Sequence, residues 1–302
     1  MALAAAGLVA SAEQGYSLVG YVNVTITNGF NFVANPFDVT GVGAPNLLSN
    51  VFSGESVPQG TKAYLWDVAS QAFSTPSTYT ALTTRWSINY DVFPGKGFVL
   101  QSPSLWTATF VGQVLLGTNT ILVPGNGKWS LLAAPLPLAG AFLSTTNVPP
   151  FPAVDGDSVF LFDNSGQVYP DHPVACFNGF GWFDSAQPAQ TDGPVINIAQ
   201  PFFILNAGSA DTNWVEVYNL EARPAGSGRL AAQGAAAPDI SRITVAAGKV
   251  TLAILNPGGG PYDVQFSTDR LSWTTVAASQ TGATWTGPAP AGVIGYYQVV
   301  QP

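Results

Sequence analysis

The chain contains one hydrophobic pattern twice, and this duplication constrains its fold more than any other feature. The stretch GFNFVANPFD at 29–38 is matched by KWSLLAAPLPL at 128–138, where corresponding residues lie 99 positions apart. The second copy keeps the bulky apolar groups but replaces Asn31 and Asn35 with serine and alanine. Catalytic chemistry would have kept the polar atoms, whereas packing keeps the bulk. The pattern therefore predicts a core strand in each of two copies.

Four further segments repeat in the same order, which indicates a duplicated unit rather than one repeated motif. Their spacings are 99, 96, 104 and 108 residues, and a slow drift of this kind is what loop insertions produce. A unit of about a hundred residues has the size of one small β-sandwich. Such copies joined in series would build length. The matched pairs are YVNVTI with TILVPG, KAYLWD with SVFLFD, GKGFVL with AQPFFI and WTATF with WVEVY.

The residue pattern predicts an all-β fold. Hydrophobic residues make up 47% of the chain, and 32 glycines and 24 prolines provide frequent turns. In the first matched strand, Tyr21 and the polar residues that alternate with it face away from Val22, Val24 and Ile26, a period of two with one buried face. We expect two tandem duplicated β-sandwich domains and a smaller C-terminal β-sandwich module.

Composition also sets the expected domain boundaries. The first residues, MALAAAGLVASAEQ, resemble the end of a secretory signal peptide with an A-x-A cleavage site, although they lack a positively charged start. The run is too short to span a bilayer, and we expect a secreted, extracellular or cell-surface protein without a membrane span. The expected segments are an apolar arm or signal remnant at 1–15, repeat 1 at 16–113, repeat 2 at 114–222, an Ala/Gly/Pro linker at 223–239 and a small β-domain at 240–302.

The order GYVNVTI, GFNFVANPFD, AYLWD, PGKGFVL, TFVGQV resembles secreted tandem β-domain proteins of environmental bacteria. The later stretches YDVQFSTDRLSWTTVA and YYQVV resemble the small fibronectin-like module at the C-terminus of many such proteins. Related architectures occur as subunits of extracellular filaments that exchange β-strands, as in chaperone–usher-type pili. The resemblance implies a structural role and provides no catalytic residue to transfer.

No catalytic set is evident, and we expect neither an enzyme nor a cofactor. The single histidine, His172, lies in a Pro-bounded stretch that is typical of an ordinary loop. The single cysteine, Cys176, is expected to be a small buried hydrophobe rather than a nucleophile. Asp155 and Asp157 flank a glycine as in a fragment of a calcium loop, and Asp163 could join them through space. The pattern of a calcium-binding loop is not completed, so an ordinary acidic turn is the alternative and no metal is assigned.

Glycans are the other ligands that the sequence suggests. Asn23 lies in the one N-x-T sequon and is the candidate glycosylation site. Trp86, Trp182 and Trp273 are candidates for stacking on sugars. The equivalence of the first two across the copies favours a core role instead, because a duplicated core needs the same bulky groups.

The sparse charge and the duplicated architecture favour a structural subunit that polymerises with itself. Charged residues are only 9% of the chain, and the net charge of −8 excludes nucleic acid as an expected partner. A segment within residues 1–26 would add as a β-strand to the next subunit, with Val22, Val24 and Ile26 as the assembly strand that sets register. The expected product is an extracellular homopolymeric filament assembled head to tail. The alternative is a monomeric cell-surface carbohydrate-binding or adhesive module.

Overall fold

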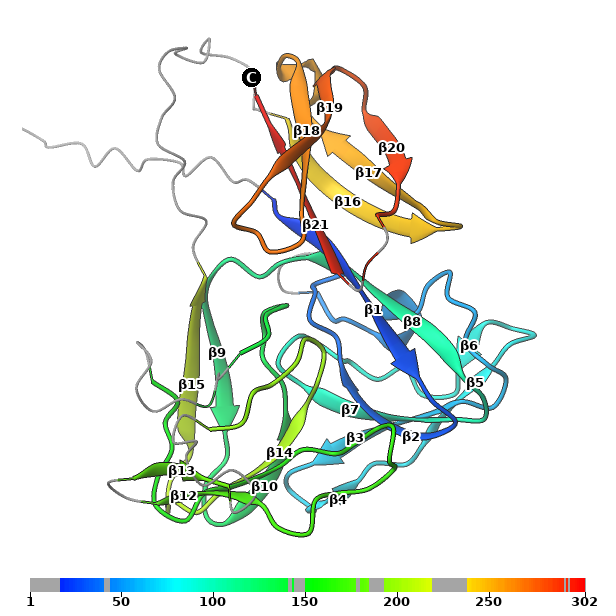
Figure 1. Ribbon diagram of the computed structural model, residues 1–302. Coiled ribbons are helices and arrows are strands. Elements are labelled where there is room, and N and C mark those ends of the chain that lie inside the picture. The colour runs from blue at the N-terminus through cyan, green and yellow to red at the C-terminus, as the bar shows by residue number, and fades with distance from the viewer. Residues whose placement is uncertain are drawn as a thin grey trace, which may run out of the picture.

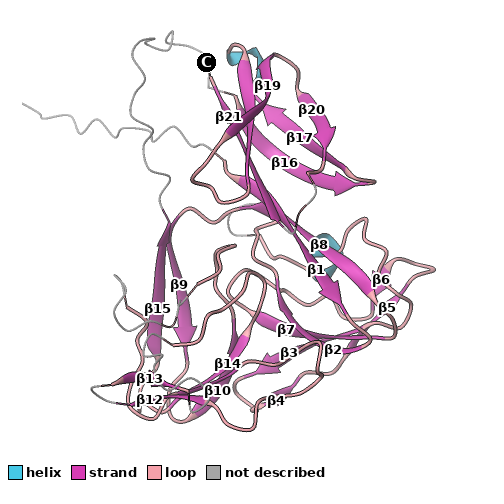
Figure 2. Ribbon diagram, viewed as in Figure 1, coloured by secondary structure: helices cyan, strands magenta, loops and turns pink. Residues whose placement is uncertain are grey.

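The structure, a computed structural model, describes residues 17–40, 44–140, 143, 150–177, 180–184, 193–218, 238–290, 292 and 294–301. Strands dominate these residues, and their helical content is limited to α1 (Leu48–Val51) and one 3₁₀ turn, η1 (Pro257–Gly259) (Figure 2). The all-β class predicted from composition is confirmed. The expected arm at 1–15 and linker residues 223–237 lie outside the described residues.

The first repeat packs a large sheet against an outer pair of strands. The sheet has the order β2-β7-β3-β5-β6, with β4 added to β3, and the outer pair is β1 with β8. Phe98 from the sheet and Phe110 from the outer pair are fully buried between the two layers. The strands are β1 (Val19–Ile26), β2 (Gly29–Ala34), β3 (Lys62–Asp67), β4 (Ala72–Phe73), β5 (Ser77–Thr80), β6 (Arg85–Trp86), β7 (Gly97–Ser102) and β8 (Trp106–Gln113).

The second repeat has the same strand order as the first. Its sheet runs β10-β14-β11-β12-β13, and its outer pair is β9 with β15. The strands are β9 (Gly117–Val123), β10 (Lys128–Leu132), β11 (Ser158–Phe160), β12 (Val174–Phe177), β13 (Gly181–Phe183), β14 (Phe202–Asn206) and β15 (Thr212–Tyr218).

The pairing register of the large sheet is also duplicated. Phe32 lies opposite Val99 in the first repeat, and their counterparts Leu131 and Phe203 lie opposite each other in the second. A slip of one residue would have moved every core side chain to the other face of the sheet. The identical register shows that the matched segments of the sequence form equivalent strands in the large sheets.

The duplicated tryptophans are core residues, as their equivalence predicts. Trp86 is 8% exposed and pairs with Tyr79, while Trp182 is 1% exposed and pairs with Cys176. Cys176 thus takes the place of a tyrosine and behaves as a small buried hydrophobe.

The outer pairs differ in register. Trp106 lies opposite Ile26 in the first pair, whereas Trp214 lies opposite Ile121, which the sequence match equates with Val22. The second pair is therefore shifted by four residues relative to the sequence match. Because side chains alternate with a period of two, an even shift keeps the same faces buried.

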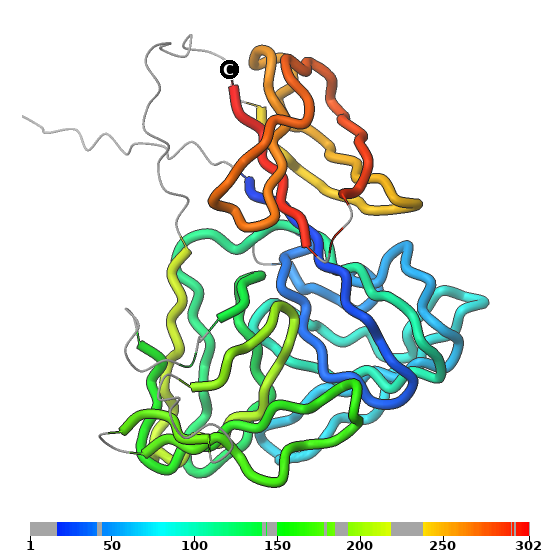
Figure 3. The backbone as a smooth tube through the Cα atoms, in the orientation of Figure 1, coloured from blue at the N-terminus to red at the C-terminus, as the bar shows by residue number. Residues whose placement is uncertain are grey.

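The two repeats lie side by side beneath the C-terminal part of the chain (Figure 3). Gln71 exchanges two hydrogen bonds with the backbone of Trp129, at 2.8 and 3.0 Å, and Gln167 does the same with Phe30, at 2.6 Å each. These two pairs are equivalent under the duplication, since the same element of each repeat contacts the same element of the other. The contact therefore has the reciprocal form of a two-fold dimer interface.

The backbone contacts at the centre of this interface are reciprocal as well. The N–H of Ala34 donates to the carbonyl of Ala199 at 2.9 Å, and the N–H of Ala133 donates to the carbonyl of Gly95 at 3.0 Å. A two-fold contact closes on itself and leaves no equivalent surface for a third copy. The repeats are thus a closed pair rather than units in series, and any lengthening must come from another part of the molecule.

A cluster of aromatic rings fills the space between the repeats. Phe32, which is 8% exposed, has its ring centroid 4.5 to 6.4 Å from those of Phe73, Phe162, Tyr169 and Phe203. Three of these four neighbours belong to the second repeat. Phe32 therefore contributes to the contact between the repeats as much as to its own sheet.

The C-terminal part forms a third, smaller sandwich. One layer is β16-β17-β20, and the other is β19-β18-β21, which continues into β1 of the first repeat. We call residues 238–301 the module. Its core contains Ile240, Leu252 and Tyr262. Its strands are β16 (Asp239–Ala246), β17 (Lys249–Leu255), β18 (Tyr262–Ser267), β19 (Thr274–Gln280), β20 (Thr284–Pro288) and β21 (Ile294–Val300).

Candidate functional site

The strand β1 belongs to two parts of the molecule at once. It lies between β21 and β8 in a five-stranded sheet of order β19-β18-β21-β1-β8 (Figure 1). All of Val19–Ile26 pairs with β8, and Val19–Val22 also pairs antiparallel with Ile294–Tyr297 of β21. The N-terminal strand therefore completes a sheet of the C-terminal module.

The two faces of β1 enter two different cores. Val22 and Ile26 are buried in the core of the first repeat, and Val24 packs against it. Val19 and Tyr21, on the opposite face, are 0% and 1% exposed in the core of the module. The sequence predicted one buried face for this strand. In Val19–Val22 the module also covers the opposite face, so both faces of that half are buried.

Glycines at the contact allow the close approach of β1 and β21. A Cβ atom on Gly20 would lie 2.9 Å from the carbonyl oxygen of Gly295. A Cβ atom on Gly295 would lie 2.7 Å from ring atoms of both Tyr21 and Phe266. Real Cβ atoms do not approach this closely, so a side chain at either glycine would force the strands or rings apart. The sequence gives no local signal for these glycines, because the contact joins residues that are far apart in the chain.

Polar groups also join the module to the rest of the chain around this contact. The backbone N–H and the hydroxyl of Ser17 donate to the two carboxylate oxygens of Asp239, at 2.7 and 3.1 Å. The hydroxyl of Tyr296 donates to the carbonyl of Pro137. Burial raises the pKa of Tyr296, which keeps this hydroxyl protonated and able to donate.

The glycosylation candidate lies beside the same contact. The side-chain nitrogen of Asn23 donates to the carbonyl of Gly292 at 3.2 Å, and its oxygen accepts from the Thr109 hydroxyl at 3.0 Å. An N-linked glycan would be attached at that nitrogen. Glycosylation would therefore compete with the bond from β1 to the module.

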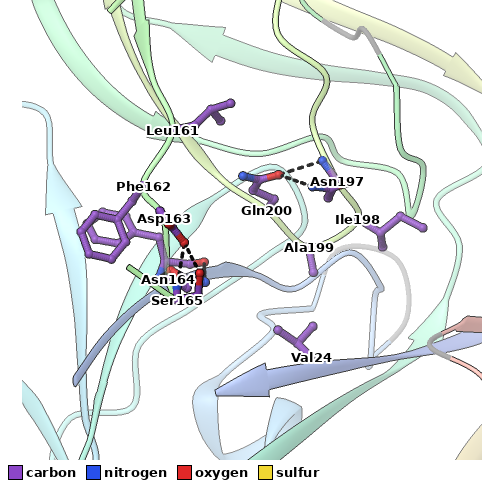
Figure 4. Close-up of a pocket in the computed structure, with 11 residues that line it drawn as sticks. Val24, Leu161, Phe162, Asp163, Asn164, Ser165, Asn197, Ile198, Ala199 and Gln200 are labelled. Atoms are coloured by element: carbon purple, nitrogen blue, oxygen red, sulfur yellow. Dashed lines mark hydrogen bonds between the residues drawn. The ribbon is translucent and has the colours of Figure 1, made fainter. Parts of the chain in front are cut away.

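In its lower half, Asn23–Ile26, the strand β1 is paired on one side only among the described residues. Val24 in this lower half lines a hollow of about 480 Å³ between the repeats (Figure 4). Its polar rim includes Asn197, whose backbone and side-chain nitrogens both donate to Gln200 at 3.0 Å. The hollow has room for apolar side chains. The Ser165 hydroxyl in its lining donates to the Asp163 carboxylate at 2.6 Å, within a turn that Asp163 caps.

The calcium candidates do not converge on one point. Asp157 is 1% exposed, and its two oxygens accept backbone N–H bonds from Ala207 and Val154, at 2.8 and 2.9 Å. Burial raises the pKa of its carboxyl group, although these two bonds act in the opposite direction. Asp163 caps a turn by accepting two bonds from Ser165. Among the residues that the structure describes, no group of three or more His, Cys, Asp or Glu residues could hold a metal ion.

The histidine and the cysteine do not form a thiol site. His172 lies 3.8 Å from Asp184, in an exposed position. Burial raises the pKa of the Cys176 thiol, and the charges of Asp157 and Asp155 raise it further. A nucleophilic cysteine needs a lowered pKa, so this environment keeps the thiol protonated and unreactive.

No known protein family, curated protein or solved structure matches the chain. Within the described part of the chain, no helix has the length and apolar character needed to cross a membrane.

Proposed function

We propose that the protein is a structural subunit of an extracellular homopolymeric filament, assembled head to tail by strand addition at β1. The observation that supports this proposal is the pairing of Val19–Val22 with Tyr297–Ile294, through which an N-terminal strand completes the C-terminal module. The same pairing between two chains would join the first repeat of one subunit to the module of the next. Main-chain hydrogen bonds of this kind supply affinity in known modes of strand addition.

This form of exchange requires no unfolding of the first repeat. The strand β1 keeps its eight residue pairs with β8 and gains the module of a neighbour instead of its own. Val22, Val24 and Ile26 stay in the core of their own repeat, while Val19 and Tyr21 enter the core of the neighbouring module. A head-to-tail contact between different surfaces extends into a filament when its rotation does not close a ring.

The connection to the module is long enough to permit exchange. Nineteen residues, 219–237, separate β15 from the described start of the module. A chain of this length spans up to about 60 Å when fully extended. An undocked module would lose Val19 and Tyr21 from its apolar core, which gives it a strong tendency to dock again. At high protein concentration, the β1 strands on which an undocked module can dock include those of other copies.

Charge does not oppose this assembly. The module has three basic and three acidic residues, and the first repeat, 16–113, has three basic and four acidic residues. No strong repulsion therefore acts between the module of one subunit and the first repeat of another. In this proposal the protein is exported, has no catalytic role and has copies of itself as its main partner.

Shortening the connection tests this assembly. Deleting residues 224–235 should hinder docking of the module on its own chain while leaving docking on a neighbour open. We expect sedimentation to shift from monomer to polymer, with filaments visible by negative-stain electron microscopy. A Gly/Ser segment of the original length is the control and should behave as the unmodified chain. A shortened chain that stays monomeric at high concentration would overturn the proposal.

A further inference from the structure

Three phenylalanines of the second repeat project into solvent from one hairpin. Phe177 ends β12, Phe183 ends β13 and Phe180 lies in the turn between them, and they are 48%, 42% and 79% exposed. The rings of Phe177 and Phe183 form an edge-to-face pair with centroids 6.1 Å apart. We call these three residues the aromatic platform. Single exposed apolar residues are ordinary, but such a cluster on one element marks a binding surface.

The fold of the repeat does not require these rings. Phe177 pairs with Gly181 as Thr80 pairs with Arg85 in the first repeat. Phe183 corresponds in the same way to Ser87, and both Thr80 and Ser87 are exposed. The equivalent hairpin is therefore built with hydroxyl side chains where the second repeat has phenylalanine.

Hydrogen-bonding groups lie beside the platform. Asp184 follows Phe183 directly, and its carboxylate lies 3.8 Å from the ring nitrogen of His172. The side chains of His172 and Asp184 are 48% and 22% exposed, so both reach solvent within the segment 172–184 that carries the rings. Exposed ring faces together with a carboxylate and an imidazole of the same segment suit a ligand with both C–H faces and hydroxyl groups.

Area and charge distinguish between the classes of partner. Three partly exposed rings offer far less than the roughly 800 Å² per partner of a stable protein interface. Two copies facing each other here would also bring together two acidic repeats, each with nine acidic residues and one basic residue between 114 and 222. The same charge disfavours nucleic acid and acidic polysaccharides. We infer that the aromatic platform binds the sugar rings of a neutral polysaccharide. This inference does not depend on strand exchange at β1.

The test is affinity electrophoresis of the full chain in gels that contain β-glucan, xylan or galactomannan, followed by titration calorimetry with the matching oligosaccharide. We expect retardation by at least one neutral polysaccharide and weakening of binding by about tenfold or more in Phe177→Ala/Phe183→Ala. Both side chains are solvent-exposed, so the variant should keep the circular dichroism spectrum and melting temperature of the unmodified chain.

Leu82→Ala is the matched control, because Leu82 is 94% exposed in the equivalent turn of the first repeat. It should leave polysaccharide binding unchanged. If the unmodified chain bound none of the three polysaccharides, the inference would be overturned. Equal retardation of the unmodified chain and the double variant would also overturn it, as would self-association that depends on the two phenylalanines.

Discussion

Replacing Phe32 with alanine is expected to lower the free energy of unfolding by about 3–5 kcal/mol, the usual cost of removing a buried phenylalanine ring. Phe32 is 8% exposed, and its ring contacts four other aromatic rings. Three of those rings belong to the second repeat, so the cavity would open between the repeats. Urea denaturation followed by tryptophan fluorescence measures the change.

Phe30→Ala is the control on the same strand. Phe30 is 45% exposed, so its truncation removes less buried surface, and the backbone bonds from Gln167 to residue 30 do not need the ring. We expect this variant to lose less than half as much stability as Phe32→Ala. Equal losses in the two variants would show that the aromatic cluster does not join the repeats in the way described.

Replacing Gly295 with valine is expected to separate the module from β1. The new Cβ would lie 2.7 Å from ring atoms of Tyr21 and Phe266, and overpacking of this kind costs about 1–3 kcal/mol. That cost corresponds to roughly a 5-fold to 150-fold increase in amide hydrogen exchange at Val19–Val22, where β1 pairs with β21. Exchange of the large sheets, including β7, should stay unchanged.

Gly258→Val is the matched control in the same module. A Cβ atom there would have no neighbour within 4 Å. Exchange at Val19–Val22 should therefore match that of the unmodified chain. If Gly295→Val also left that exchange unaltered, the close approach of the strands would not be what holds the module in place.

The repeated strands could be predicted because local patterns determine them. The alternation of Val22, Val24 and Ile26 identifies one core face, and the spacing of Trp86 and Trp182 identifies equivalent core positions. These features depend on hydrophobic periodicity, which is a property of short stretches of sequence. The shared register of the two copies confirms that the matched strands are equivalent. The strand order of the sheets was not predicted, because it depends on pairing between strands that are distant in the chain.

The contacts between the parts could not be predicted in this way. Tyr21 alternates with Asn23 and Thr25 as if it were on an open face, yet the module buries it through residues that are more than two hundred positions away.

The contacts that Gln71 and Gln167 make between the repeats do have a signal in the sequence. Each glutamine follows an aspartate by four positions in otherwise different turns, and both have positive φ, 51° and 56°. A polar residue kept in two divergent surface turns indicates a contact made outside its own repeat.

The most direct test of strand exchange at β1 uses two chains that each carry one new cysteine in a Cys176→Ala background. Directly opposed residues of antiparallel strands have Cα atoms about 4.5–5.5 Å apart, which suits a disulfide. Val22 lies opposite Ile294 of the module, and Thr25 lies opposite Thr107 of β8. The two chains of each pair are unfolded, mixed, refolded at high concentration and oxidised.

In each mixture every chain has a single cysteine, so a disulfide can form only between different chains. The proposal predicts covalent dimers from the mixture of Val22→Cys with Ile294→Cys and none from the mixture of Thr25→Cys with Thr107→Cys, because β1 gains a new module but keeps its own β8. A chain with both Val22→Cys and Ile294→Cys shows that the bond can form. Absence of dimers from the first mixture, while that doubly substituted chain forms its internal disulfide, would contradict assembly by exchange at β1.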